Sequence, residues 1–523
     1  MSSNNELKSV VDKICNTLRN NMETTEYRDY IIGFLFYKYL SELSEQNFEK
    51  YKKRLKNISY EEFDQTNSQY KAIEEMIFKD EESFFINYKY SFQNVVKQVY
   101  QGKTIIPLLE EAFEQIEIMN NGLDVENKEY FSDLFKSIDL TDKNLGNIEE
   151  EKERTIQTII KEISSLKLSM EDVDHFGTTY EHLLSEFASD SGKKAGEFYT
   201  PSSVAQLISD IASYNRTKIS KAYDPACGSG SLLIKLIRKD NIKHFGKIYG
   251  QEIKNATYNL ARMNFILRGV PFSKIDIKNG DTLLKPMHIQ EEGTFDCVVA
   301  NPPFSLKWNP SKELAKDVRF NPFPSLAPKR YADFAFLQHM LYHVEPKNGI
   351  VVSVFSLGVL NRNNPKAEKE IRKYIVDKNY IDTIIFMPEN LFYNTSISTC
   401  IIVARKNKPS NEKGIFMINA TKEFEASKRQ NILTNENITK IFNAWKNKKE
   451  IEKFAKYIPY DEIVSNDYSL SMGLYDLDNY QEETENINIK EVEAELKKIN
   501  QEIEEQEKLF EKNLAEFEKK YNN

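Results

Sequence analysis

The sequence predicts an α/β domain that follows an all-helical N-terminal region and precedes a long C-terminal helix. Short apolar runs alternate with amphipathic stretches from about residue 170 to about residue 480, the pattern of a doubly wound parallel sheet. Residues 1–150 instead repeat apolar side chains every three or four positions, as α-helices do. Residues 481–523 repeat them every seven positions, which is typical of a coiled coil.

Length and composition are those of a globular chain with more than one core. The chain has 523 residues, of which 40% are hydrophobic and 29% charged. No apolar run approaches the ~20 residues of a membrane span, and residues 1–10 do not resemble a signal peptide. The four cysteines form no C-x-x-C pair, which favours a reducing cytosol and argues against a zinc site. We expect a cytoplasmic protein that contacts no membrane.

The net charge of −9 is unevenly distributed. Residues 481–523 carry 13 acidic and 7 basic side chains, so they account for −6 and the remaining body for −3. The body can therefore hold a basic cleft, although it is not strongly cationic. If the chain binds nucleic acid, we expect a partner to supply much of the affinity.

Three domains follow from these patterns. We assign 1–165 to the helical N-terminal domain, 166–480 to the α/β domain and 481–523 to the C-terminal helix. A helical connector spans 149–168, and Thr200-Pro201 is predicted to supply the N-cap and first residue of a helix that continues over 203–213.

The α/β domain is expected to contain at least seven strands. We predict strands, the last at an edge of the sheet, at 221–223, 247–251, 275–278, 295–300, 349–354, 380–386, 398–404 and 414–418. Helices are predicted at 232–238, 255–268, 333–343 and 366–377. Ligands of open α/β sheets bind at the carboxyl ends of such strands.

The turn Asn301-Pro302-Pro303-Phe304 follows the fourth predicted strand. Consecutive prolines hold the backbone extended, so an amide, rigid carbonyls and an aromatic ring lie together at the strand end. This combination suits a flat nitrogenous group, with two acceptors for an amino group and a ring for stacking. A Pro-Pro loop that merely ends a strand is the alternative, and the motif alone does not decide between them.

A glycine-rich turn, Asp224-Pro-Ala-Cys-Gly-Ser-Gly-Ser231, follows the first strand. Its small residues allow a ligand to approach the backbone, but it matches neither the dinucleotide fingerprint nor a P-loop. Glu252 ends the second strand, where it can accept hydrogen bonds from a ribose diol, and Asp281 ends the third, where an adenine amino group can donate to it. A single strand-end acid is more often a cap, whereas three in succession indicate a nucleoside site.

Together with Gly-Glu-Phe-Tyr-Thr-Pro at 196–201, this ordered set of motifs resembles the amino-methylating DNA methyltransferases. More narrowly, it resembles the modification subunit of type I restriction-modification systems over nearly the whole chain. The Asn-Pro-Pro-Phe turn is shared with RNA and protein-glutamine methyltransferases, but the preceding Phe-Tyr-Thr-Pro segment is far more specific. The resemblance implies a Rossmann-like S-adenosylmethionine-dependent methyltransferase domain.

The resemblance also implies a role for each motif residue. Asn301 and the Pro302 carbonyl would hold the N6 amino group of a flipped-out adenine, with Pro303 completing the turn and Phe304 stacking on the base. Asp224 would lie beneath the methionine end of S-adenosylmethionine, Glu252 would bind its ribose and Asp281 its adenine. The cofactor would also be bordered by Glu197, Phe198, Tyr199, Thr200, Pro201, Ser202, Gly228, Ser229, Gly230 and Ser231. No metal is required.

Two further signals are weaker. His339 and His343 lie four residues apart, but the Glu of a His-Glu-x-x-His zinc site is missing and their helix is apolar. The segment 305–330 carries six basic and two acidic residues directly after the catalytic turn. It is either a solvated loop or a loop that contacts DNA phosphates.

The heptad positions in the tail are Ile489, Leu496, Ile503, Phe510 and Phe517, and they favour docking on a partner helix over packing on the chain's own body. The chain has no room for sequence-reading domains, so a separate specificity subunit is expected to select the target in double-stranded DNA. The resemblance adds a second copy of the same subunit and, in complexes that cleave, a nuclease/translocase subunit. The alternatives are a stand-alone RNA or protein-glutamine methyltransferase, or a non-catalytic DNA clamp or scaffold.

Overall fold

The architecture comes from a computed structural model of the whole chain. It describes residues 2–18, 22, 24–52, 59–62, 84–120, 131–166, 183, 187, 199–363, 365–392, 395–409, 412–427 and 430–477. The predicted segment 481–523 and residues Glu197 and Phe198 therefore lie outside the described residues. Within the described part, no helix has the length and apolar character that a bilayer span would need.

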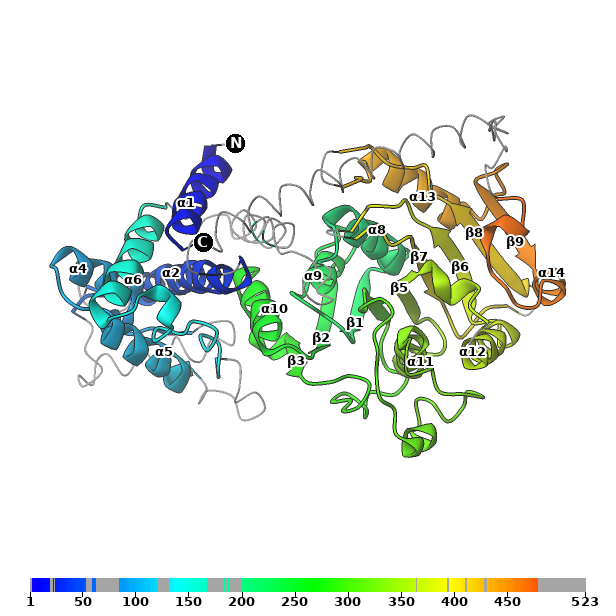
Figure 1. Cartoon of the computed structure of the whole chain (residues 1–523), viewed down its shortest axis with the longest axis horizontal. Helices are drawn as coiled ribbons and strands as arrows, with labels where there is room; N and C mark the ends of the chain where they lie inside the picture. The colour runs from blue at the N-terminus through cyan, green and yellow to red at the C-terminus, as the bar shows by residue number, and fades with distance from the viewer. Residues whose placement is uncertain are drawn as a thin grey trace, which may run out of the picture. The chain divides into compact units, whose positions relative to one another are not determined.

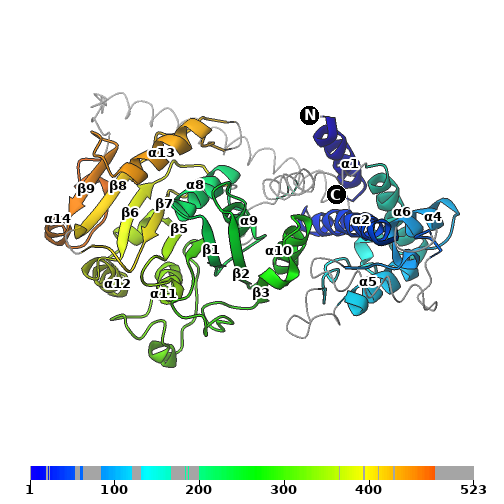
Figure 2. The ribbon, with the colours of Figure 1, turned by 180° about the vertical axis from the view of Figure 1, so that it is seen from behind.

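A single mixed sheet runs through the α/β region, with the strand order β3-β2-β1-β4-β5-β7-β6-β8-β9 (Figure 2). The strands are β1 (Lys218–Asp224), β2 (His244–Glu252), β3 (Ile275–Asn279), β4 (Cys297–Ala300), β5 (Ile350–Ser356), β6 (Ile381–Phe386), β7 (Thr399–Ala404), β8 (Gly414–Asn419) and β9 (Ala455–Pro459). Strands β3, β2, β1, β4 and β5 pair in parallel. Their carboxyl ends therefore meet at one edge of the sheet.

Two details of the predicted sheet were wrong. Strand β7 lies antiparallel between β5 and β6, so the sheet is mixed rather than parallel. Strand β8 is not an edge, because it pairs with β6 on one side and with β9 on the other. Strand β9 is short and only partly apolar, and its residues are only partly buried, as is usual at a solvent-facing edge. This weak pattern explains why the sequence did not predict β9.

Helices cover both faces of the sheet (Figure 1). One core contains the buried faces of α8 (Ser202–Ser213), α9 (Ser231–Ile237) and α13 (Asn435–Asn447). The other contains those of α11 (Asp333–His343), α12 (Lys366–Asp377) and α14 (Tyr460–Ser465). The side chains of β5, β6 and β7 are buried along their whole length, which explains why these strands read as continuous apolar runs. Every α/β helix that the sequence predicted is present, whereas α13 was not predicted.

The described N-terminal residues are helical, as predicted. The helices are α1 (Ser2–Leu18), α2 (Thr24–Lys52), α4 (Phe92–Tyr100), α5 (Ile106–Asn120) and α6 (Glu149–Ser164). Their aromatic side chains pack together; the rings of Phe113 and Phe135, for example, stack with centroids 4.4 Å apart. Most of the described aromatic residues of this region are therefore core residues, although Tyr100 is exposed.

One helix belongs to two cores. Helix α10 (Asn255–Leu267) directs Met263 and Leu267 into the N-terminal core and Phe265 into the core of the α/β sheet. Arg262 donates through Nη1 to the carbonyl of Ser132 over 2.9 Å, which adds a polar contact to the apolar one. The N-terminal helices and the sheet thus share α10 as a common element.

Arg319 holds the long connection between β4 and α11 against the sheet. Its guanidinium is buried and donates to both carboxylate oxygens of Asp317, at 2.9 and 2.8 Å. It also donates over 2.9 Å to the carbonyl oxygens of Thr282 and Leu283 and over 3.0 Å to Nδ1 of His339. Nearly all donors of this planar group are paired, so its burial is compensated.

We predict that Arg319→Met destabilises the fold by about 3 kcal/mol, because it leaves buried acceptors without donors. Urea unfolding followed by tryptophan fluorescence measures this, since Trp308 packs on Phe320 beside Arg319. Lys316→Ala, an exposed cation in the same segment, serves as the control and should stay close to wild type. Equal unfolding midpoints for Arg319→Met and the wild-type chain would contradict the prediction.

Candidate active site

The candidate site lies where the parallel strands end. Asp224 and Glu252 are the last residues of β1 and β2, and Asn301 follows the last residue of β4. Because β1 pairs in parallel with both β2 and β4, these three side chains start from the same edge of the sheet. A crevice at this edge is where open α/β sheets bind ligands.

The turn after β1 has the backbone that its glycines predicted. Gly228 and Gly230 have φ values of 52° and 77°, in the left-handed region that glycine adopts without strain. A Cβ added at Gly228 would meet nothing within 4 Å, so open space lies beside this backbone. At Gly230 it would come within 2.9 Å of the Phe265 ring, which places the turn directly against α10. Asn264 on the same helix donates over 2.9 Å to the Ser229 carbonyl and so fixes the turn.

Asp224 is a buried carboxyl group with one protein donor. Its Oδ1 accepts a hydrogen bond of 2.9 Å from the backbone N–H of Ala226. Burial raises the pKa of the Asp224 carboxyl to about 8, and the charge of Glu252 adds to this rise. Asp224 is therefore mainly protonated at neutral pH in the ligand-free chain.

Glu252 and Asp281 are partly exposed, and both accept hydrogen bonds from nearby backbone N–H groups. Glu252 accepts from the backbone N–H groups of Gly228 and Lys254, at 3.1 and 2.9 Å, and so ties the ends of β1 and β2 together. One oxygen of Asp281, Oδ1, caps the following turn by accepting from Leu283 and Leu284 at 2.9 and 3.0 Å. The capping alternative thus describes part of what each acid does. Their roles toward a nucleoside remain predictions.

The amide of Asn301 has one paired end and one unpaired end. Nδ2 donates to the hydroxyl of Thr200 over 3.1 Å. Oδ1 is buried and has no hydrogen-bond partner among the described residues. Buried acceptors are nearly always paired in native proteins, so this oxygen is an acceptor that the donor of a ligand could satisfy.

The prediction that Thr200 caps a helix was wrong. Helix α8 begins at Ser202, Pro201 occupies the N-cap position, and no side-chain hydrogen bond caps the helix. The Thr200 hydroxyl is used by Asn301 instead. No local pattern indicates this pairing, because the two residues are about a hundred positions apart in the sequence.

Sequence reasoning missed the residues that support the turn after Asn301. The ring of Phe304 meets that of Phe392 edge-on, with centroids 5.5 Å apart. Ser305, at a φ of 52°, donates its backbone N–H over 3.3 Å to the buried carboxylate of Asp333. Asp333 in turn pairs with Arg362 at 3.3 Å, so an ion pair stands behind the turn. No local motif connects these positions, which meet only in the fold.

Comparisons with known protein families agree with this geometry. Residues 171–486 match the family model described as N-6 DNA Methylase, and residues 7–163 match the model described as HsdM N-terminal domain. The chain belongs to the N-6 DNA methylase family. It is an adenine-specific DNA methyltransferase, and the expected Rossmann-like methyltransferase fold with a helical N-terminal domain is confirmed. The DNA family match disfavours an RNA or protein-glutamine methyltransferase.

Relatives of this methylase include type I restriction enzyme subunits. The MpnII methylase subunit of Mycoplasma pneumoniae is 36% identical and aligned over 93% of this chain and 91% of that protein. The MjaVII methylase subunit of Methanocaldococcus jannaschii is 36% identical over 77% of this chain and 68% of that protein. The type I methyltransferase subunit from Streptococcus thermophilus has a similar structure, with a TM-score of 0.82 at 37% identity, covering 90% of this chain and 99% of that one. The predicted resemblance to type I modification subunits is confirmed.

The two histidines of α11 are structural residues of the methylase. His339 is fully buried and bonds Tyr223 through Nε2, at 2.8 Å. Because Arg319 donates to its Nδ1, the ring proton lies on Nε2. Burial keeps the pKa of His339 well below its usual value and lowers that of His343 to about 4, so both rings are neutral.

The basic segment 305–330 divides into two kinds of residue. Arg319 is buried and structural, so it is unavailable to phosphates. The remaining cations are exposed and lie on the connection that begins at the Asn-Pro-Pro-Phe turn: Lys307, Lys312, Lys316, Lys329 and Arg330. A phosphate-contacting role is thus limited to these five.

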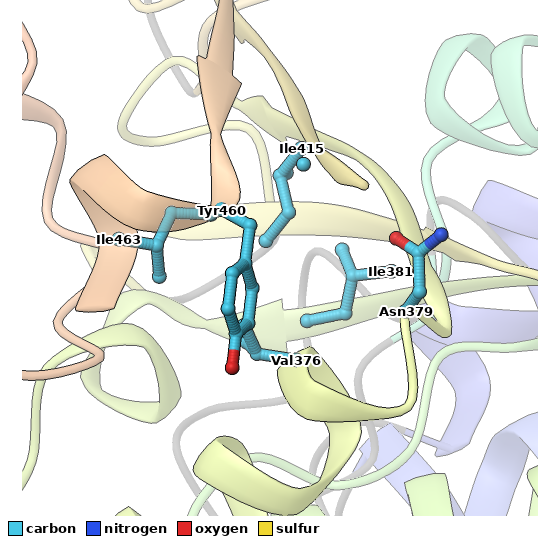
Figure 3. Close-up of a pocket in the computed structure, with 7 residues that line it drawn as sticks. Val376, Asn379, Ile381, Ile415, Tyr460 and Ile463 are labelled. Carbon is cyan, nitrogen blue, oxygen red and sulfur yellow. The ribbon is translucent and has the colours of Figure 1, made fainter. Parts of the chain in front are cut away.

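The methylase also has a narrow, largely apolar crevice. It is lined by Val376, Asn379, Ile381, Gly414, Ile415, Tyr460 and Ile463. Figure 3 shows Tyr460 lying across it among the aliphatic side chains, and the Tyr460 hydroxyl donates over 2.7 Å to Asp377. Ile381 and Gly414 begin β6 and β8, so this crevice is at the amino-terminal ends of the strands, opposite the candidate site.

The raised pKa of Asp224 predicts how pH affects stability. The folded-state value of about 8 exceeds the unfolded value of about 3.9, so the folded chain binds the extra proton between them. Stability from this group is complete below about pH 4 and is lost as pH rises through 8. Asp224→Asn should therefore raise the melting temperature of the ligand-free methylase by about 2–4 °C more at alkaline than at acidic pH.

Thermal melts at about pH 5 and about pH 8.5 measure this difference. Asp240→Asn, which changes an exposed carboxylate, should show no such pH dependence. A pH-independent effect of Asp224→Asn would show that the Asp224 carboxyl is ionised across this range.

Proposed function

We propose that this chain transfers a methyl group from S-adenosylmethionine to N6 of an adenine that has been extruded from double-stranded DNA. The observation that carries the proposal is the buried, unpaired Oδ1 of Asn301 at the carboxyl end of β4. It is an acceptor without a donor, and an adenine amino group supplies two donors.

Open space lies beside the backbone of Gly228, and we propose that S-adenosylmethionine occupies it. The glycine-rich turn, with Gly228, Ser229, Gly230 and Ser231, allows close approach of a ligand. Asp224 would face the methionine end, Glu252 the ribose and Asp281 the adenine. The Oδ1 atom of Asp281 caps the following turn, and its Oδ2 atom is not used by that cap. The segment 197–202 would close the site from the other side. S-adenosylmethionine supplies a methyl group on a sulfonium that departs as a neutral thioether.

The chain's own contribution to the reaction is positioning. The lone pair of an adenine amino nitrogen is delocalised into the ring, so the group is a poor nucleophile. Asn301 Oδ1 and the Pro302 carbonyl would accept its two hydrogens and draw the nitrogen toward tetrahedral geometry. That change frees the lone pair for in-line attack on the methyl group. The neutral amide is sufficient, because the proton can leave after the transfer.

Base extrusion requires a surface for the displaced adenine. Phe304 would stack on the base, and its ring is itself supported by the edge of Phe392. The αL conformation of Ser305, held by Asp333, fixes the chain direction directly after Phe304. The exposed cations of segment 305–330 would then contact the DNA backbone close to the extruded base.

Asn301→Ala is expected to reduce methyl transfer by about 100-fold or more while cofactor affinity stays unchanged. The measurement is incorporation of labelled methyl groups into DNA, paired with calorimetry for S-adenosylmethionine. Asn435→Ala, which removes an exposed amide at the start of α13, is the control. If Asn301→Ala leaves methylation intact, the proposed site is wrong, and a DNA clamp or scaffold becomes the better account.

We also propose that the chain works as the methylase subunit of a type I complex. The relatives are named as type I methylase subunits, and the fold leaves no room for a sequence-reading domain in the described region. A separate specificity subunit, a second copy of this chain and, where cleavage occurs, a nuclease/translocase subunit are the proposed partners. A cytoplasmic location and the domain limits 1–165, 166–480 and 481–523 stay predictions. Sequencing the native genome for N6-methyladenine with and without this gene tests the activity and yields the target.

Deleting 485–523 should abolish assembly with the specificity subunit, because the heptad positions of this segment are the proposed docking surface. Cofactor affinity of the shortened chain should match that of the full chain. Co-purification of the two subunits measures assembly. A truncated chain that still co-purifies would assign docking to another part of the molecule.

A further inference from the structure

Asn301 must be oriented as well as placed. The carboxamide oxygen and nitrogen are nearly equal in size, yet one accepts a hydrogen bond and the other donates. An amino group facing Oδ1 gains a hydrogen bond, whereas an amino group facing Nδ2 meets a second donor. Methyl transfer therefore depends on which end of the amide faces the crevice.

In the orientation with Oδ1 toward the crevice, Nδ2 points to Thr200 and needs an acceptor there. The Thr200 hydroxyl is that acceptor, at 3.1 Å. Its side chain is 7% exposed, so water does not readily replace it. Without the hydroxyl, the productive orientation would bury an unpaired N–H, which is costly.

The backbone around Thr200 is well suited to this task. A residue before proline is restricted to extended conformations, and Pro201 follows Thr200 directly. Pro201 in turn accepts the backbone N–H of Ala205 over 2.9 Å, which ties the segment to the first turn of α8. The Thr200 hydroxyl is thus carried by a segment that Pro201 and the first turn of α8 restrict.

We propose that Thr200 is a positioning residue for the methyl transfer step. Its hydroxyl pairs the amide nitrogen of Asn301, so that Oδ1 can face the target amino group without an unpaired donor behind it. This inference rests on the proposed function and deepens it. It assigns Thr200 to the amide of Asn301, where the motif alone predicted only a border of the cofactor site.

Two variants of Thr200 separate the hydroxyl from the shape of the side chain. Thr200→Val keeps the shape and removes the acceptor, so the single-turnover methylation rate should fall by about 10- to 100-fold. Thr200→Ser keeps the hydroxyl, so its rate should stay within about threefold of wild type. The assay uses the complex with its specificity subunit and a DNA duplex that carries the target.

Two further readouts distinguish positioning from a structural or cofactor-binding role. Calorimetric affinity for S-adenosylmethionine should fall far less than the methylation rate in Thr200→Val, and 2-aminopurine fluorescence at the target position should still report base extrusion. A loss of cofactor affinity as large as the loss of rate would overturn the inference. So would a Thr200→Ser variant as slow as Thr200→Val. If Thr200→Val does not fold, a Thr200→Ser rate that falls about tenfold or more below wild type overturns the inference.

Asn301→Ala gives a stricter test, because it leaves no amide for the Thr200 hydroxyl to orient. The penalty of Thr200→Val should shrink to about threefold or less in the Asn301→Ala background, measured on the residual rate as a double-mutant cycle. Equal penalties in both backgrounds would overturn the inference. The wild-type complex in the same assay separates the two proposals. An inactive wild-type complex counts against both the proposed function and the inference. An active wild-type complex together with an unaffected Thr200→Val variant counts against the inference alone.

Discussion

Parallel pairing of β1 with β2 and β4 is the constraint on which the site depends. It sends the glycine-rich turn, Glu252 and Asn301 out of the same edge of the sheet. Two of these segments are also held by a contact from outside the sheet: Asn264 holds the turn, and Asp333 holds the residue after Phe304. The geometry of the crevice is therefore a property of the strand order, and the surrounding helices tune it.

The negative charge at this edge of the sheet is smaller than the number of acidic residues suggests. Three acidic residues end successive strands, yet burial keeps Asp224 largely protonated near neutral pH. The oxygens of Glu252 accept hydrogen bonds from backbone N–H groups, and one oxygen of Asp281 accepts from the turn that follows it. The ligand-free crevice is thus less negative than a count of carboxylates implies. Arrival of a cationic methyl donor would favour ionisation of Asp224 and couple binding to the release of a proton.

The sequence predicted those features of the fold that depend on a single segment of the chain. Local sequence patterns predicted four features that the structure contains: the glycine-rich turn, the proline-stiffened turn at Asn301, and the helices α11 and α12. Features that depend on two distant segments were not predictable. Strand β7 looks like any buried strand, and its antiparallel direction follows only from its neighbours β5 and β6. Likewise, Arg319 was counted among exposed cations, because the acceptors that bury it come from residues 282, 283 and 339.

Helix α10 gives the boundary between the helical region and the sheet an unusual character. One side of the helix completes the N-terminal core, while Asn264 and Phe265 hold the glycine-rich turn from the other. At α10, the N-terminal helices and the sheet are therefore joined by shared packing. A substitution deep among the N-terminal helices can move Ser229 without touching the sheet. Grafting the N-terminal helices of one family member onto the sheet of another would therefore succeed only if α10 travelled with them or was refitted on both sides.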